Sequence, residues 1–127
     1  LAAARLAPGG RVVVETINPE SLYALTRAYV LDPTHVRPVH PALLAFLAER
    51  VGFETIEVAY QAPVPARERV AEIDEAMAAG GAAIERLVRE INARLRRVDQ
   101  LCCAPQEYTL VAAKSGEAPW AEPTASS

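Results

Sequence analysis

The sequence predicts an α/β fold, because helical and strand patterns alternate along much of the chain. A glycine turn at 8–10 separates a helical run from an unbroken β-branched run at 11–16. Gly52 likewise separates an apolar helical pattern from the alternating apolar and polar residues of 53–60. A third strand pattern covers 107–114. With 127 residues, 51% hydrophobic and 23% charged, the chain has the length and composition of one globular domain.

The elements follow from local signals. Residues 1–7 have the alanines and leucines of a helix end, and since the chain starts inside this pattern we expect it to be part of a longer protein. The β-branched run at 11–16 predicts a strand covered on both faces in a largely parallel sheet. Residues 19–31 predict a helix with Asn18 as its cap and Pro19 in its first turn, and 41–51 predict a second helix.

Residues 66–101 change character, being rich in alanine, arginine and glutamate, and predict one long helix or a helical pair broken at Gly80-Gly81. An apolar stripe from Val70 to Val98 would either pack back on the sheet or form a coiled coil with another chain. Because the stripe is short for a coiled coil, packing on the sheet is the preferred interpretation.

The predicted organisation therefore has three parts: an α/β domain (1–64 and 104–114), a helical insertion (65–103) and a tail (115–127). The tail is rich in proline, alanine and serine, which predicts disorder, with Trp120 as the residue that could hold it down.

Composition also excludes several classes of function. The net charge of −3 comes without a basic stripe, which argues against nucleic acid as a partner. No apolar run approaches the roughly 18 residues of a membrane span, and the N-terminus lacks an export signal, so we expect a cytoplasmic protein. The adjacent Cys102 and Cys103 are interpreted as small buried hydrophobic residues, and no metal site is expected.

Reactive side chains concentrate in the loop Asp32-Pro-Thr-His-Val-Arg-Pro-Val-His-Pro41, which holds both histidines and three prolines. Prolines fix φ and remove backbone donors, so this loop should be stiff. His40 directly precedes a predicted helix, which favours a capping or packing role. Glu15 and Asn18 lie at the carboxyl end of a strand, where α/β sheets bind ligands, although capping or loop stapling explains them equally well.

Four segments carry a resemblance to a known family. They are Leu6-Ala-Pro-Gly-Gly-Arg-Val-Val-Val-Glu-Thr16, then Thr34-His35 with Pro41 and Leu44, then Glu49-Arg-Val-Gly-Phe53, and Gln106-Glu-Tyr-Thr-Leu-Val-Ala-Ala-Lys114. Together they resemble the C-terminal half of a class I S-adenosylmethionine-dependent methyltransferase. The resemblance implies a partial Rossmann-like sheet in which the last strand inserts antiparallel between the other two. The loop further resembles methyltransferase modules of bacterial glycosyltransferase and polysaccharide-synthesis proteins.

The resemblance implies the substrate side of an O-methyltransferase acting on a small-molecule or glycan acceptor. The family's glycine-rich loop for S-adenosylmethionine does not occur in this chain, so the chain alone should neither bind the cofactor tightly nor catalyse transfer. His35 is the candidate base, with Asp32 orienting its ring, and this role is preferred over the alternative of a structural hydrogen bond that holds the loop. The candidate acceptor contacts are Asp32, Arg37, His40, Glu15 and Asn18. For Asp32 and Arg37, an ion pair that stiffens the loop is an equally simple interpretation.

A function of another class stays open beside this one. The helical stripe at 70–98 could make the chain a non-catalytic interaction module that forms a homodimer through residues 66–101.

Overall fold

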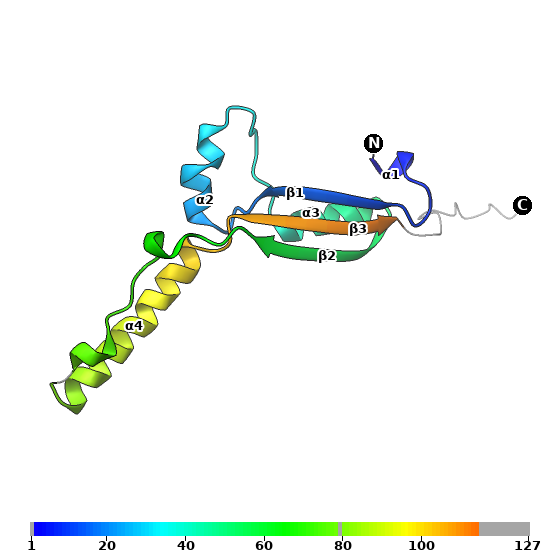
Figure 1. Cartoon of the computed structure of the whole chain (residues 1–127). Coiled ribbons are helices and arrows are strands. Elements are labelled where there is room, and N and C mark those ends of the chain that lie inside the picture. The colour runs from blue at the N-terminus through cyan, green and yellow to red at the C-terminus, as the bar shows by residue number, and fades with distance from the viewer. Residues whose placement is uncertain (1, 79, 115–127) are drawn as a thin grey trace, which may run out of the picture.

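The computed structural model describes residues 2–78 and 80–114, so the predicted tail and Trp120 lie outside the described residues (Figure 1). The chain is a mixed α/β structure. Its elements are, in order, α1 (Ala2–Arg5), β1 (Arg11–Ile17), α2 (Leu22–Arg27), the 3₁₀ turn η1 (Tyr29–Leu31), α3 (Pro41–Arg50), β2 (Phe53–Gln61), the 3₁₀ turns η2 (Ala66–Glu68) and η3 (Glu75–Ala78), α4 (Ala82–Cys102) and β3 (Glu107–Lys114).

The three strands form one sheet in the order β1-β3-β2, and β3 runs antiparallel to both neighbours. Val14 and Val58 both pair with Leu110 of the central strand. β1 and β2 are therefore parallel to each other, and their carboxyl ends lie at the same end of the sheet. This order confirms the predicted insertion of the last strand between the other two.

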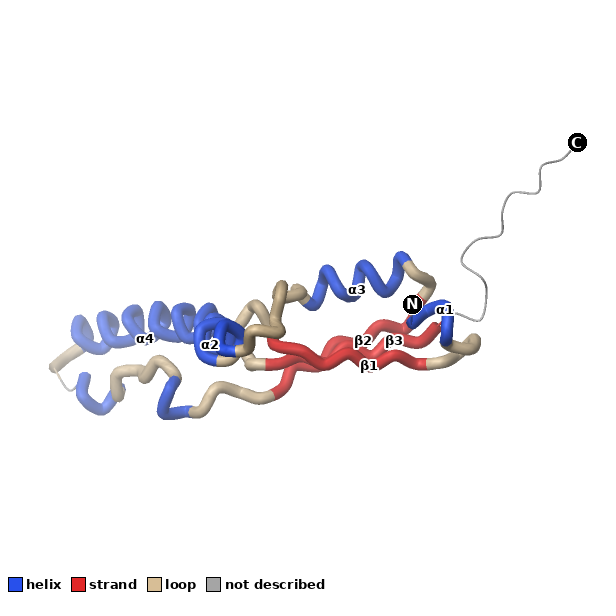
Figure 2. The backbone as a smooth tube through the Cα atoms, turned by 90° about the horizontal axis from the view of Figure 1, so that it is seen from above, coloured by secondary structure: helices blue, strands red, loops and turns tan. Residues whose placement is uncertain are grey.

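The core lies between the sheet and α3, which runs along one face of the sheet (Figure 2). Alternate residues of β3 point into it, with Tyr108 and Ala112 at 0% exposure and Leu110 at 1%. Phe53 and Ala48 complete the buried cluster. The phenol of Tyr108 donates a hydrogen bond of 2.8 Å to the carbonyl of Val39, which fastens the proline-rich loop to the central strand.

The opposite face of the sheet is open among the described residues. Val13 on β1 is 63% exposed, and its register partner Val111 is half-buried. The prediction that β1 is covered on both faces is therefore wrong for this part of the chain. β1 is also an edge strand in the described sheet, and an edge strand with exposed apolar residues favours association.

The predicted helix over 19–31 is shorter than expected and has a different cap. α2 begins at Leu22, and the hydroxyl of Ser21 accepts the capping hydrogen bond from the amide of Ala24 at 3.3 Å. A 3₁₀ turn follows at 29–31. Ser21 replaces Asn18 as the cap because the residues before it form a turn.

The prediction of helix over 66–81 is wrong. This segment makes two short 3₁₀ turns joined by non-helical chain, and the chain then reverses at Gly81, where φ is +99°, to begin α4. We call residues 66–78 the strap, because they run outward from β2 alongside α4, which then returns to the sheet (Figure 2). The strap and α4 together form an arm.

Side chains of α4 hold the backbone of the strap in place. The amide of Asn92 bonds both the N–H and the carbonyl of Ile73, each at 2.8 Å. The carboxylate of Asp99 accepts from the amide of Val70 at 3.0 Å and from the guanidinium of Arg69. Since these bonds use the groups that a helix would need for itself, the strap stays non-helical.

The arm extends away from the sheet (Figure 1). The predicted packing of the helical stripe on the sheet is therefore wrong, because only the end of α4 that leads to β3 approaches the sheet.

None of the helices described here has the length and apolar character needed to cross a membrane.

Acid should release the strap. Hydrogen bonds from Arg69 and Val70 hold the pKa of Asp99 below its usual range. A lowered folded-state pKa means that the stabilisation is complete above the unfolded value of about 3.9 and is lost as the pH falls through the folded value. The protection of the Val70 amide from hydrogen exchange, relative to its intrinsic exchange rate at each pH, should fall over that range. In the Asp99→Asn variant, residue 99 cannot titrate, so the Val70 amide should exchange faster at neutral pH and its protection should no longer depend on pH. If the variant keeps the pH dependence, another carboxylate is responsible for it.

Candidate functional site

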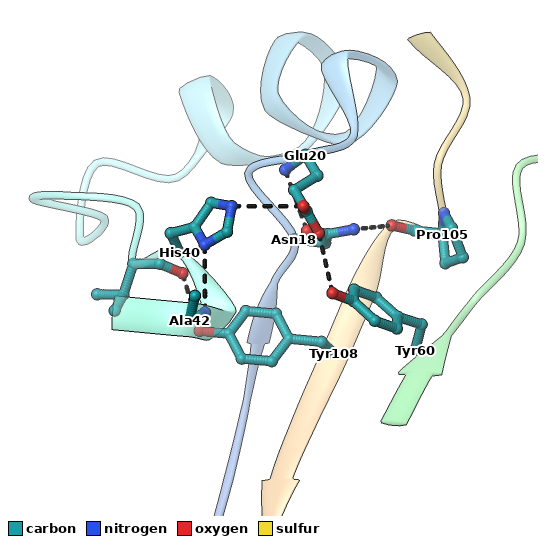
Figure 3. Close-up of polar contacts among 8 residues, drawn as sticks. Asn18, Glu20, His40, Ala42, Tyr60, Pro105 and Tyr108 are labelled. Carbon is teal, nitrogen blue, oxygen red and sulfur yellow. Dashed lines mark hydrogen bonds and ion pairs between the residues drawn. The ribbon is translucent and has the colours of Figure 1, made fainter. Parts of the chain in front are cut away.

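A cluster of polar side chains lies at the carboxyl ends of β1 and β2 (Figure 3). We call Asn18, Glu20, His40 and Tyr60 the polar cluster. Glu20 lies at its centre: the phenol of Tyr60 donates to Oε2 at 3.0 Å, and Nε2 of His40 lies 3.3 Å from Oε1. Residues that lie 40 positions apart in sequence therefore meet on one carboxylate.

The second nitrogen of His40 fixes its tautomer. The amide of Ala42 donates to Nδ1 at 3.2 Å, which makes His40 the N-cap of α3, one of the two roles that the sequence favoured. Because Nδ1 accepts this bond, it carries no proton, and a neutral ring has its proton on Nε2, facing Glu20. Glu20 thus receives a second donor.

Asn18 holds Glu20 in position from within the protein. Its side chain is fully buried, accepts from the amide of Glu20 at 3.0 Å and donates to the carbonyl of Pro105 at 2.8 Å. Both ends of the Asn18 amide are therefore bonded within the chain. This is the loop-stapling geometry that the sequence left open beside ligand binding.

The polar cluster borders a groove of about 400 Å³. The rest of the wall comes from the end of α4 and the segment that follows it. The lining residues are Asn18, Glu20, Tyr60, Gln100, Leu101, Ala104 and Pro105. Of these described residues, Glu20 alone carries a carboxylate, so the groove combines apolar walls with one strong hydrogen-bond acceptor.

Tyr60 acts as a donor in this arrangement. Burial raises the pKa of Tyr60, and so do the hydrogen bond to Glu20 and the negative charge of that carboxylate. The phenol therefore keeps its proton at neutral pH and holds Glu20 in one orientation.

His35 lies in a separate position, within the proline-rich loop. Its ring stacks on Tyr29 with centroids 4.8 Å apart and an interplanar angle of 6°. Nδ1 lies 3.3 Å from the carbonyl of Tyr29, and Nε2 lies 3.6 Å from the carboxylate of Asp32. Both ring nitrogens therefore face acceptors, and a neutral ring can donate to only one of them.

Asp32 also accepts from the amide and the hydroxyl of Thr34, at 2.8 and 2.7 Å. These bonds lower the pKa of Asp32, with His35 adding to the effect. Asp32 pairs with His35 rather than with Arg37, which is exposed, so the alternative of an Asp32–Arg37 ion pair is wrong in this structure.

Glu15 is not brought to the polar cluster. Its carboxylate accepts from Gln61 at 3.0 Å, and Gln61 also donates to Thr109 at 2.7 Å, on the open face of the sheet. Tyr60 and its register partner Tyr108 point to the other face of the sheet, where α3 lies. The structure thus divides the predicted site residues among the polar cluster, the loop and the open face.

Sequence reasoning missed Glu20 and Tyr60. Glu20 fell inside a predicted helix, and Tyr60 was the last residue of a predicted strand. The pair Asn18-Pro19 was a usable signal for Glu20. Asparagine before proline indicates an Asx turn directly after the strand, and this turn places the side chain of Glu20 at the carboxyl end of β1.

No family model matches the sequence, and no curated protein matches it. Among solved structures, the chain is similar to a SAM-dependent methyltransferase from Archaeoglobus fulgidus, with 30% sequence identity and a TM-score of 0.68. The likeness covers 84% of this chain and 46% of that one, so the chain spans about half the length of the methyltransferase. With its three-stranded sheet in the predicted order, the chain has a methyltransferase-like, partial Rossmann-like α/β fold.

Proposed function

We propose that this chain forms the acceptor side of an S-adenosylmethionine-dependent O-methyltransferase. The observation that carries the proposal is the groove beside Glu20, which lies at the carboxyl ends of parallel strands in a methyltransferase-like fold. Ligands of open α/β sheets bind at that end of the strands. The acceptor is a small molecule or glycan that brings a hydroxyl to Glu20 and an apolar part to the wall formed by Leu101 and Pro105.

The described residues do not fit the cofactor by themselves. S-adenosylmethionine presents ribose hydroxyls and a charged amino acid group, which need free polar partners. In the groove, the one carboxylate keeps capacity for a further donor beside Tyr60 and His40, but the Asn18 amide is bonded within the chain, and one carboxylate is too few partners for the ribose and the amino acid group together. We therefore assign cofactor binding to residues outside this chain.

The groove can align an acceptor hydroxyl and take its proton. Glu20 is held by donors on both oxygens, and a carboxylate oxygen has capacity for a further hydrogen bond. Holding the acceptor in one orientation supplies most of the catalysis in a displacement reaction, and a positioned base adds to it.

An experiment on the intact protein tests this function. The gene should be expressed with the coding sequence upstream of Leu1, and cofactor binding should be measured by calorimetry beside residues 1–127 alone. We expect the longer protein to bind S-adenosylmethionine and to transfer a labelled methyl group to hydroxyl compounds, and residues 1–127 to do neither. A longer protein that does not bind the cofactor would overturn the proposal.

His35 is the second candidate for the base, and one substitution tests it. If His35 takes the proton, His35→Ala should cut turnover in the intact protein far more than it weakens cofactor binding. Since its ring nitrogens already face Tyr29 and Asp32, we expect a smaller loss than from changes at Glu20. The readouts are turnover and cofactor affinity, and unchanged turnover would dismiss His35 as the base.

A second function, self-association through residues 66–101, is favoured by exposed apolar side chains on α4, such as Leu87 and Leu101. It is compatible with methyl transfer, since those residues lie mainly on the arm.

A further inference from the structure

An apolar ridge runs the length of α4. Ile84, Leu87, Val98 and Leu101 are 45%, 55%, 47% and 74% exposed, and Ile91 is half-buried between them. Their spacing of three, four, seven and three residues places them on one side of the helix. We call these five residues the α4 ridge.

The strap does not cover the α4 ridge. The helix face under the strap is a different one, marked by the buried Val88, Asn92 and Asp99. The arm also extends away from the sheet, so no described element lies over the length of the ridge (Figures 1 and 2). A continuous exposed stripe of this kind on a helix is an interaction surface.

Charges beside the α4 ridge identify its occupant. Arg94 interrupts the ridge at its middle, and Glu90 and Arg97 flank it; all three are exposed, and no ion pair joins them to other described residues. In a parallel pair of α4 helices, Arg94 would lie beside the partner's Arg94. In an antiparallel pair, Glu90 lies beside the partner's Arg97, and the arginines are separated.

The apolar residues fit the same arrangement. Antiparallel register places Ile84 beside the partner's Leu101 and Leu87 beside the partner's Val98, while Ile91 packs on the methylenes of the partner's Arg94. We infer that the occupant of the α4 ridge is a second copy of this chain, whose arm pairs antiparallel with the first in a closed two-fold dimer.

This pairing gives the partner a place at the candidate site. Leu101 belongs both to the α4 ridge and to the wall of the groove beside Glu20. Since the partner's Ile84 lies beside Leu101, the tip of the partner's arm extends the groove wall. The inference does not rest on methyl transfer, and its readout is molecular mass.

The first test measures mass in solution by sedimentation equilibrium for residues 1–127. We expect twice the 13.7 kDa chain mass, and Leu87→Asp or Val98→Asp should each give a monomer with unchanged circular dichroism. Arg89→Gln, on the opposite side of α4, is the matched control and should stay dimeric. A native chain that is monomeric would overturn the inference. A dimer that persists in both aspartate variants would also overturn it, because the contact would then lie elsewhere, for example at the edge of β1.

A charge exchange tests the orientation. Glu90→Arg alone should weaken the dimer, because it faces Arg97 of the partner subunit. Combining Glu90→Arg with Arg97→Glu should restore it, since each reversed charge again meets its opposite. A double variant as weak as the single one would refute antiparallel pairing.

Discussion

Replacing Glu20 with glutamine in the intact protein should lower turnover by about 10²–10⁴-fold, the usual contribution of a general base. Glutamine keeps the size of the side chain and can still accept from the Tyr60 phenol, but it cannot take a proton from the acceptor. Cofactor affinity should hardly change, because we assign cofactor binding to residues outside this chain. Turnover and cofactor binding are therefore measured on the same preparations.

Glu57→Gln is the control for this substitution. Glu57 is an exposed carboxylate on β2, the strand that carries Tyr60, but it lies away from the polar cluster. The control should keep native turnover. A Glu20→Gln protein that turns over at the native rate would remove Glu20 as the base, whereas loss of cofactor binding in that protein would mean that the carboxylate serves the cofactor instead.

Leu110→Ala should strongly destabilise the sheet. Leu110 is 1% exposed on the central strand and pairs with both Val14 and Val58. Truncating a buried leucine costs about 2–5 kcal/mol, because transfer energy is lost and a cavity remains. The free energy of unfolding of a small domain is about 5–15 kcal/mol, so this loss is a large fraction of the total stability.

Urea titration at one fixed protein concentration measures the effect, since dimerisation would otherwise shift the midpoint. Val111→Ala is the matched control: the neighbouring residue points to the open face and should cost about 1 kcal/mol or less. Equal losses at the two positions would contradict the assignment of the core to the α3 face.

The strands could be predicted from sequence nearly to the residue. The β-branched run and the Gly52 signal gave strands at 11–16 and 53–60, and the structure extends each by one residue. The third strand, 107–114, has the predicted bounds. Local information was sufficient here because glycine turns and side-chain periodicity mark strand ends directly.

The strap could not be predicted in the same way. Its composition favours helix, but the groups that decide its conformation, Asn92 and Asp99, lie about 20 to 30 residues further along the chain. Tertiary hydrogen bonds outweighed local propensity. The prediction that β1 is covered on both faces was wrong for a related reason. A β-branched run indicates a tendency to be buried, but it does not indicate which faces of the strand this chain covers.

The candidate site shows the same limit. A capping or packing role was favoured for His40 because it directly precedes Pro41, a local signal, and His40 caps α3 in the structure. The meeting of Glu20, His40 and Tyr60 depends on strand order and on the turn at Asn18, which bring together residues up to 40 positions apart. Sequence patterns indicate such residues singly, whereas only the fold shows that they share a carboxylate.

The hydrogen bond from Asn18 to Pro105 couples the end of the arm to the candidate site. Asn18 ties the segment that follows α4 to the peptide of Glu20, so a shift of the arm would be passed to the backbone that carries the carboxylate. If arm pairing orders that segment, dimerisation and acceptor binding become thermodynamically linked. Linkage is reciprocal: an acceptor that binds the dimer more tightly must strengthen the dimer by the same factor. Protein concentration would then change acceptor affinity.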